Sequence, residues 1–118
     1  MADNFSTYVT NEQFIQRARQ NLPQGPWDYL AGASESETTQ RRNRLAFDKI
    51  AFRPRVLVDV SGVDASTNFI GQDIRIPVLL APIGSLQTFN PGGGAEVSEA
   101  AGNFGTMHVL SSVTLPSL

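Results

Sequence analysis

The sequence predicts an α/β chain in which helices and a small hairpin precede one parallel βαβ unit. Residues 78–81 form a short run without a polar side chain, which is typical of a strand covered on both faces. Residues 93–104 favour a helix, and residues 107–111 form a second short apolar strand. Strand, helix and strand in this order make a βαβ unit, whose two strands run parallel.

The first helix is predicted over residues 11–21. Thr10 and Gln13 have the spacing of a capping box, and apolar residues follow at helical intervals. The stretch Pro23-Gln24-Gly25-Pro26 should then break the helix.

Two further helical segments are expected before residue 50. Residues 27–31 should form one or two turns that stop near Gly32. Ser34 and Glu37 repeat the capping-box spacing, which predicts a helix over about 35–47.

The segment that follows is predicted to be extended and then to fold back on itself. Residues 49–59 favour an extended chain, and residues 64–67 favour a turn. Residues 69–70 and 74–76 flank Gly71-Gln72-Asp73, which predicts a small hairpin.

Composition excludes several classes of function. The chain has 118 residues, 41% of them hydrophobic and 17% charged, and a net charge of −2, so we expect no nucleic-acid partner. Without cysteine it has neither disulfide nor thiolate chemistry, and one histidine cannot build a multi-histidine metal site. We also expect no membrane span, no signal peptide and a cytoplasmic location.

The parallel unit suggests that the sequence is the front part of a longer protein. Two parallel strands cannot cover each other's faces, and parallel sheets are nearly always buried on both sides. The alternative is a small mixed α/β domain that is complete in itself.

A ligand-facing rim is expected where the two strands end. Pro82 removes a backbone donor and ends regular pairing, and Gly84 with Ser85 opens a loop that a ligand can approach closely. Ser111 ends the second strand. Because ligands gather at the C-terminal ends of parallel strands, Pro82–Ser85 and Ser111 should face an anion or a cofactor.

Several short motifs occur in one order along the chain. They are Asp28-Tyr29-Leu30; Glu35 and Glu37-Thr38-Thr39; Asn43-Arg44-Leu45-Ala46-Phe47; Arg53-Pro54-Arg55-Val56-Leu57-Val58-Asp59-Val60; Asp64-Ala65-Ser66-Thr67; Ile70-Gly71; Pro77-Val78-Leu79-Leu80-Ala81-Pro82-Ile83-Gly84; Gly105-Thr106; and Leu110-Ser111-Ser112. Together they resemble the opening of the FMN-dependent 2-hydroxy-acid oxidases and dehydrogenases, the family of glycolate oxidase, lactate oxidase and mandelate dehydrogenase.

The resemblance implies the N-terminal part of a (β/α)₈ TIM barrel. Residues 1–118 would be one part of an FMN hydroxy-acid dehydrogenase domain, with a helical prelude and a bottom-closing hairpin over 1–76 and the first βαβ unit over 77–118. A whole barrel of this kind needs about 250 residues. The remainder of the barrel, in the same or a second chain, would therefore be a partner, and the family suggests a homotetramer.

The implied reaction is the oxidation of an L-2-hydroxy acid to a 2-keto acid with FMN as cofactor. The family's catalytic histidine belongs to a later part of the barrel, so no catalytic residue is assigned to this chain and it should be inactive alone. His108, inside an apolar strand, is interpreted as a buried, hydrogen-bonded structural residue.

Three kinds of position carry over from the family by resemblance. Tyr29 would bind the substrate carboxylate, since a phenol donates a hydrogen bond without adding charge. Pro82, Ile83 and Gly84 would lie along the flavin ring, and Ser111 would hydrogen-bond FMN. From the residues alone, the pattern favours a half-buried aromatic at Tyr29 and an ordinary strand-ending turn for the loop. Ser111 is then a capping hydroxyl, and a one-residue slip would exchange it with Ser112.

Two departures from the family pattern affect the expected pocket. Asn90-Pro91-Gly92-Gly93-Gly94 replaces a His-Pro-x-Gly-Glu-like stretch, and Val113 stands where an aromatic residue is frequent. A roomier or more aliphatic pocket is expected. Two alternatives stay open: a non-catalytic barrel remnant that acts as an interaction module, and an unrelated phosphate-binding barrel.

Overall fold

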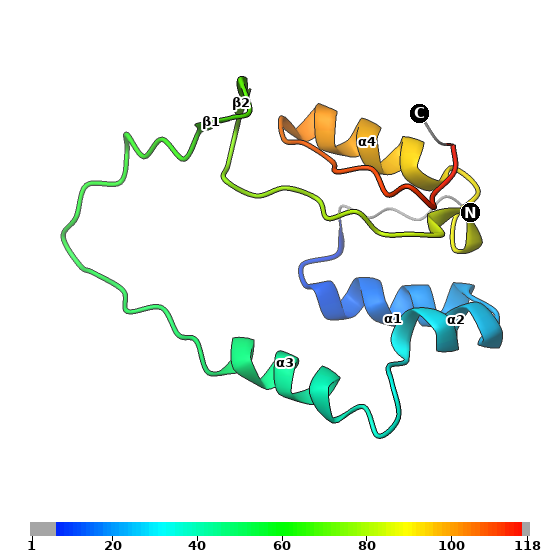
Figure 1. Ribbon diagram of the computed structural model, residues 1–118. Coiled ribbons are helices and arrows are strands. Elements are labelled where there is room, and N and C mark those ends of the chain that lie inside the picture. Colours follow the sequence, from blue (N-terminus) through cyan, green and yellow to red (C-terminus); the bar gives the residue numbers. More distant parts are fainter. Residues whose placement is uncertain (1–6, 117–118) are drawn as a thin grey trace. The chain divides into compact units, whose positions relative to one another are not determined.

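The computed structural model describes residues 7–116 and divides the chain into two compact units, residues 1–53 and 54–118 (Figure 1). The elements are, in chain order, α1 (Asn11–Asn21), α2 (Gln24–Ala31), α3 (Thr38–Asp48), β1 (Thr67–Phe69), β2 (Gln72–Ile74), the 3₁₀ turn η2 (Leu86–Thr88) and α4 (Gly93–Phe104).

The first helix, α1, has the predicted bounds, and its start follows from the capping residues. The Gln13 side-chain oxygen accepts hydrogen bonds from the backbone N–H of Thr10 at 3.0 Å and of Val9 at 2.6 Å. These bonds satisfy donors that would otherwise lack a partner at a helix start.

The second helix, α2, begins three residues earlier than predicted. Pro26 was expected to break the chain, but it lies in the first turn of α2, where a missing N–H costs no intrahelical hydrogen bond. The helix ends before Gly32, as predicted, and the Gly32 N–H bonds the Asp28 carbonyl at 2.9 Å.

The third helix, α3, begins at Thr38 rather than at 35, and the prediction of its start was wrong. Glu35 and Glu37 have φ values of 50° and 57°, in the left-handed region, so neither can continue a right-handed helix. The Glu37 carboxylate instead accepts a hydrogen bond from the Ala33 N–H at 3.2 Å, which stabilises the turn before α3.

The hairpin prediction is confirmed with shifted strand bounds. β1 and β2 pair antiparallel with Thr67 opposite Ile74. Ile70 and Gly71 connect them with φ values of 50° and 78°, and two consecutive positive φ values are the signature of a type I′ turn. The predicted extended segment over 49–59 contains no regular strand.

In the βαβ unit α4 has the predicted bounds, but the two strands reduce to a single parallel bridge between Leu80 and His108. The Leu80 N–H bonds the Met107 carbonyl and the Val109 N–H bonds the Leu80 carbonyl, each at 3.0 Å. Burial on both faces was predicted, yet Val78 remains 54% exposed and Leu80 37%. A lone pair of short strands has one ladder and too little cover to form a sheet.

The segment after His108 runs back alongside α4, as Figure 1 shows for the orange-red end of the described chain. Gly94 donates its N–H to the Leu115 carbonyl at 3.0 Å, and Leu115 donates its N–H to the Gln87 side chain at 3.1 Å. Thr114, between these bonds, is only 1% exposed. The loop after the first strand, the start of α4 and the end of the second strand are thereby joined.

Candidate functional site

The candidate site is built where the loop after the first strand meets the end of the second. The Ser85 N–H donates to the Val113 carbonyl at 3.2 Å, which ties the two segments together. A Cβ placed on Gly84 would lie 3.6 Å from the Ser111 Oγ and 2.8 Å from the Val113 Cγ2. Gly84 and Ser111 therefore lie at the same end of the strands, as the parallel arrangement predicts.

Ser111 is oriented by its own turn. Its Oγ accepts the Val113 N–H at 3.3 Å, and its carbonyl accepts the Thr114 N–H, also at 3.3 Å. Because Oγ acts as an acceptor here, its hydroxyl hydrogen is available for donation to a ligand. Ser111 is half-buried whereas Ser112 is exposed, so Ser111 is the serine that faces Gly84.

The loop presents main-chain donors at this end. The N–H groups of Ile83 and Gly84 donate to no atom within residues 7–116. Pro82 and Ile83 are exposed, and Gly84 is half-buried. Two main-chain N–H groups and the Ser111 hydroxyl are therefore hydrogen-bond donors at this end of the strands.

Tyr29 lies on α2, in the first unit, and its side chain is 69% exposed. The neighbouring Asp28 accepts a hydrogen bond from the Gln24 amide at 2.6 Å, and Gln24 in turn accepts one from Arg19 at 2.6 Å. Pro82, Ile83, Gly84 and Ser111 lie together in the second unit. Tyr29 lies in the first unit, and its role stays a prediction.

His108 is placed as a structural residue rather than at the rim. Its Nδ1 lies 2.9 Å from the Ser98 Oγ of α4, and the residue is half-buried. Its Nε2 is buried and has no hydrogen-bond partner among residues 7–116. The ring joins the second strand to the helix; it is hydrogen-bonded, as predicted, but half-buried rather than buried.

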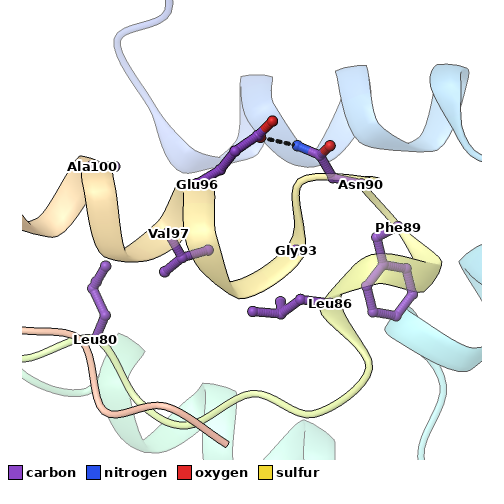
Figure 2. A pocket seen from close by; sticks show the side chains of 8 residues that line it. All are labelled: Leu80, Leu86, Phe89, Asn90, Gly93, Glu96, Val97 and Ala100. Carbon is purple, nitrogen blue, oxygen red and sulfur yellow. Dashed lines mark hydrogen bonds between the residues drawn. The ribbon is translucent and has the colours of Figure 1, made fainter. Parts of the chain in front are cut away.

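Two contacts escaped the sequence analysis. Gln87 accepts hydrogen bonds across 28 residues, and no local pattern marks such a long-range acceptor. Glu96 accepts a 2.5 Å hydrogen bond from the Asn90 side chain and lies over Gly92. A carboxylate therefore lies near the start of α4 (Figure 2), although the glutamate of the family pattern is missing. Its negative charge is stabilised there by the positive end of the helix dipole.

Charge and ligand chemistry elsewhere in the described chain are limited. The backbone N–H of Ser61 lowers the pKa of the Asp59 carboxyl below 3.8, and that of Ser66 does the same for the pKa of Asp64. Residues 7–116 contain no cluster of metal-binding side chains. None of the helices within that range is long and apolar enough to span a bilayer.

The comparison with protein families decides the assignment. The profile described as FMN-dependent dehydrogenase matches residues 18–118. The chain belongs to this family. Its members depend on FMN.

Relatives within the family include plant oxidases and structurally known mandelate enzymes. Glycolate oxidase 3 of Oryza sativa subsp. indica is 38% identical over 111 residues, 93% of this chain and 30% of that protein. Glycolate oxidase 1 of Zea mays is 41% identical over 105 residues, 88% of this chain and 28% of that protein. A crystal structure of mandelate oxidase matches with a TM-score of 0.82 and 33% identity, covering 91% of this chain and 32% of the other.

This chain therefore spans about a third or less of the length of the family members it matches. By itself the described part is a helical piece with a two-stranded sheet and one parallel bridge. Its likeness to the mandelate oxidase fold makes it equivalent to a portion of that larger structure.

Proposed function

We propose that this chain supplies the flavin-ring and substrate-carboxylate side of an enzyme that oxidises an L-2-hydroxy acid to a 2-keto acid. The remainder of the (β/α)₈ barrel, in the same or a second chain, completes it. The observation that carries the proposal is the meeting of Gly84 and the Ser111 hydroxyl at one end of the strands. The chain alone has no turnover.

Each candidate residue has a defined role. The main-chain N–H groups of Ile83 and Gly84 donate to the polar edge of the flavin, and Pro82 sets the direction of the loop along the ring. The Ser111 hydroxyl donates to FMN from the second strand. FMN, when bound, supplies the hydride-accepting chemistry of the reaction. Tyr29 donates its phenolic hydrogen to the substrate carboxylate and fixes the orientation of the acid.

The side chain at position 113 sets the space next to this rim. Val113 is 65% exposed and touches the loop at the site where a Gly84 Cβ would stand. An isopropyl group fills less volume than an aromatic ring, so we propose an aliphatic or bulky 2-hydroxy acid as substrate.

The experiment tests the chain together with a barrel. Residues 1–118 are co-expressed with the part of Zea mays glycolate oxidase 1 that follows its matched region, and the product is assayed for flavin absorbance and for oxidation of 2-hydroxy acids. We expect a yellow, active complex and no turnover from the isolated chain titrated with FMN. Stoichiometric FMN binding with turnover by the isolated chain would contradict the proposal.

Two substitutions separate the residue roles in that complex. Ser111→Ala should weaken FMN binding about tenfold, the effect of one lost hydrogen bond in a ligand site, whereas Ser112→Ala should change it less than twofold. Tyr29→Phe should raise KM for the hydroxy acid, since one hydrogen bond to the carboxylate is lost. An unchanged KM would contradict this role of Tyr29.

The second candidate function is a non-catalytic interaction module. The backbone N–H and C=O groups of Leu79 and Ala81, which have no partner within residues 7–116, favour it, because an open strand edge pairs readily with another chain. Mass spectrometry of the natural protein distinguishes the two. Co-purifying barrel sequence with flavin absorbance supports the enzyme, and a colourless monomer supports the module.

We propose a homotetramer in the cytoplasm for the enzyme.

A further inference from the structure

The segment that connects α3 to β1 has no regular structure. Figure 1 shows residues 51–66 in green as a continuous trace without helix or strand. Every residue in this connecting segment is exposed, and none of its backbone groups bonds another backbone group within residues 7–116. Within the described chain, its hydrogen bonds run from the N–H groups of Ser61 and Ser66 to carboxylates two residues earlier. The boundary between the two units, Arg53–Pro54, lies inside the segment.

Such a backbone is the substrate form that endopeptidases bind. An endopeptidase holds its substrate chain extended, and the substrate's N–H and C=O groups pair with a strand edge of the enzyme. A helix or a paired strand would first have to unfold, so cleavage concentrates in exposed segments without regular structure. Residues 51–66 can pair in this way without breaking a backbone hydrogen bond.

The residue types of the connecting segment select the class of enzyme. Arg53 and Arg55 are its two cations, and neither forms an ion pair within residues 7–116. Trypsin-like enzymes bind such a side chain in a pocket with a carboxylate at its base and cleave the bond that follows it. Arg53 is followed by Pro54, whose ring takes the place of the backbone N–H after the cleaved bond. The suitable bond is therefore Arg55–Val56.

The residue after this bond does not resist extension. Leu57 has a φ of 59°, in the left-handed region, which is strained for a residue other than glycine. No hydrogen bond within residues 7–116 holds Leu57 in that conformation, and its side chain is fully exposed. The extended form that an enzyme binds therefore relieves strain at this position.

The remaining basic residues are held by regular structure or by contacts. Those within helices are Arg17 and Arg19 of α1, and Arg41, Arg42 and Arg44 of α3. At the end of α3, the Lys49 N–H bonds the Leu45 carbonyl at 3.2 Å, and the next N–H, that of Ile50, bonds the Phe47 carbonyl at 2.9 Å. The Arg75 N–H bonds the Gly105 carbonyl at 2.7 Å. Cleavage after any of these residues requires local unfolding first.

We propose that the Arg55–Val56 bond is a processing site for a trypsin-like endopeptidase. Water is the co-reactant: its hydroxyl adds to the Arg55 carbonyl carbon, its other hydrogen goes to the Val56 nitrogen, and the new carboxylic acid passes its proton to the new amine. Because the chain has no cysteine, no disulfide then joins the two pieces. Tyr29 and Ser111 end in different polypeptides. The inference does not depend on the proposed function, since it involves neither flavin nor hydroxy acid.

The test is limited digestion of residues 1–118 with trypsin under native conditions, followed over time by mass spectrometry of the intact products. The first products should be residues 1–55 and 56–118. They should form at least tenfold faster than any product cut after another lysine or arginine, because those bonds become accessible only through local unfolding.

Three variants isolate the bond. Arg55→Gln should slow the loss of the full-length chain at least tenfold, whereas Arg42→Gln, at an exposed position of α3, should change it less than twofold. Val56→Pro keeps the arginine and removes an N–H that has no partner within residues 7–116, and it should slow the loss as much as Arg55→Gln does.

The proposal would be overturned by a first cut after Lys49 or Arg75, by cuts at several residues at similar rates, or by a chain that trypsin leaves intact. Equal effects of Arg55→Gln and Arg42→Gln would overturn it as well. Rapid cleavage of the Val56→Pro variant between residues 55 and 56 would show that the bond is not recognised as described.

Discussion

Gly84→Ala tests directly whether the loop after the first strand is packed against the end of the second. The backbone at Gly84 is outside the left-handed region, so alanine is allowed there, and it should stabilise the chain by about 0.4–1 kcal/mol through the unfolded state. The new Cβ would, however, stand 2.8 Å from the Val113 Cγ2, closer than real Cβ contacts come. Overpacking costs typically about 1–3 kcal/mol, and the exposed Val113 can yield, which favours the lower end of that range.

The net loss expected for Gly84→Ala is about 0.5 kcal/mol in the presence of Val113. In a Val113→Ala background the clash is absent, and the same substitution should stabilise by about 0.5 kcal/mol. The four proteins form a double-mutant cycle with a coupling energy of about 1 kcal/mol, measured by urea denaturation of the full chain. If Gly84→Ala changes the free energy of unfolding equally in both backgrounds, within about 0.3 kcal/mol, the two segments are not in contact and the candidate site is misplaced.

Three further predictions concern the second unit. Gly93→Ala should lower the free energy of unfolding by about 2–4 kcal/mol, because φ is +51° and a Cβ would overlap the Leu115 carbonyl oxygen. Gly102→Ala, which has open space around it, should raise the free energy of unfolding by about 0.5–1 kcal/mol. The two urea midpoints should therefore move in opposite directions. Ser98→Ala should cost about 1 kcal/mol because the half-buried His108 ring loses its hydrogen bond, and Ser98→Thr should restore most of it. The lowered pKa of Asp59 implies that its turn is stabilised above pH 3.8 and loosens as the pH falls through the folded pKa; an NMR titration midpoint at or above 3.8 would contradict this.

Local signals predicted the elements that depend on local chemistry. α1 has the expected bounds because its capping box and helical spacing act within one or two turns, and α4 has them although no side chain caps its start. The hairpin follows from Gly71, which accepts the positive φ that its turn requires. The start of α3 was missed because nothing in the sequence marks Glu35 and Glu37, two non-glycine residues, as left-handed.

The candidate site was predictable as far as topology determines it. Two parallel strands end at the same edge, so Gly84 and Ser111 had to meet there if the strands were correctly placed. The Val113 contact and the Gln87 hydrogen bonds are details of side-chain packing between distant segments, which no spacing rule encodes. The two predicted strands form only one bridge, because strand formation depends on neighbouring strands and on packing against them. A sequence pattern does not show whether those neighbours are present.

The hydrogen bonds that Gln87 accepts make the order of synthesis important. Its side chain holds the Leu115 N–H at 3.1 Å, and the Leu115 carbonyl in turn holds the first turn of α4. The ribosome adds Leu115, which bonds to both the loop and α4, only after it has made those two segments. During elongation Gln87 therefore lacks this bond until 28 further residues have been added, and Gly94 lacks its bond to the Leu115 carbonyl for 21 residues (115 − 94).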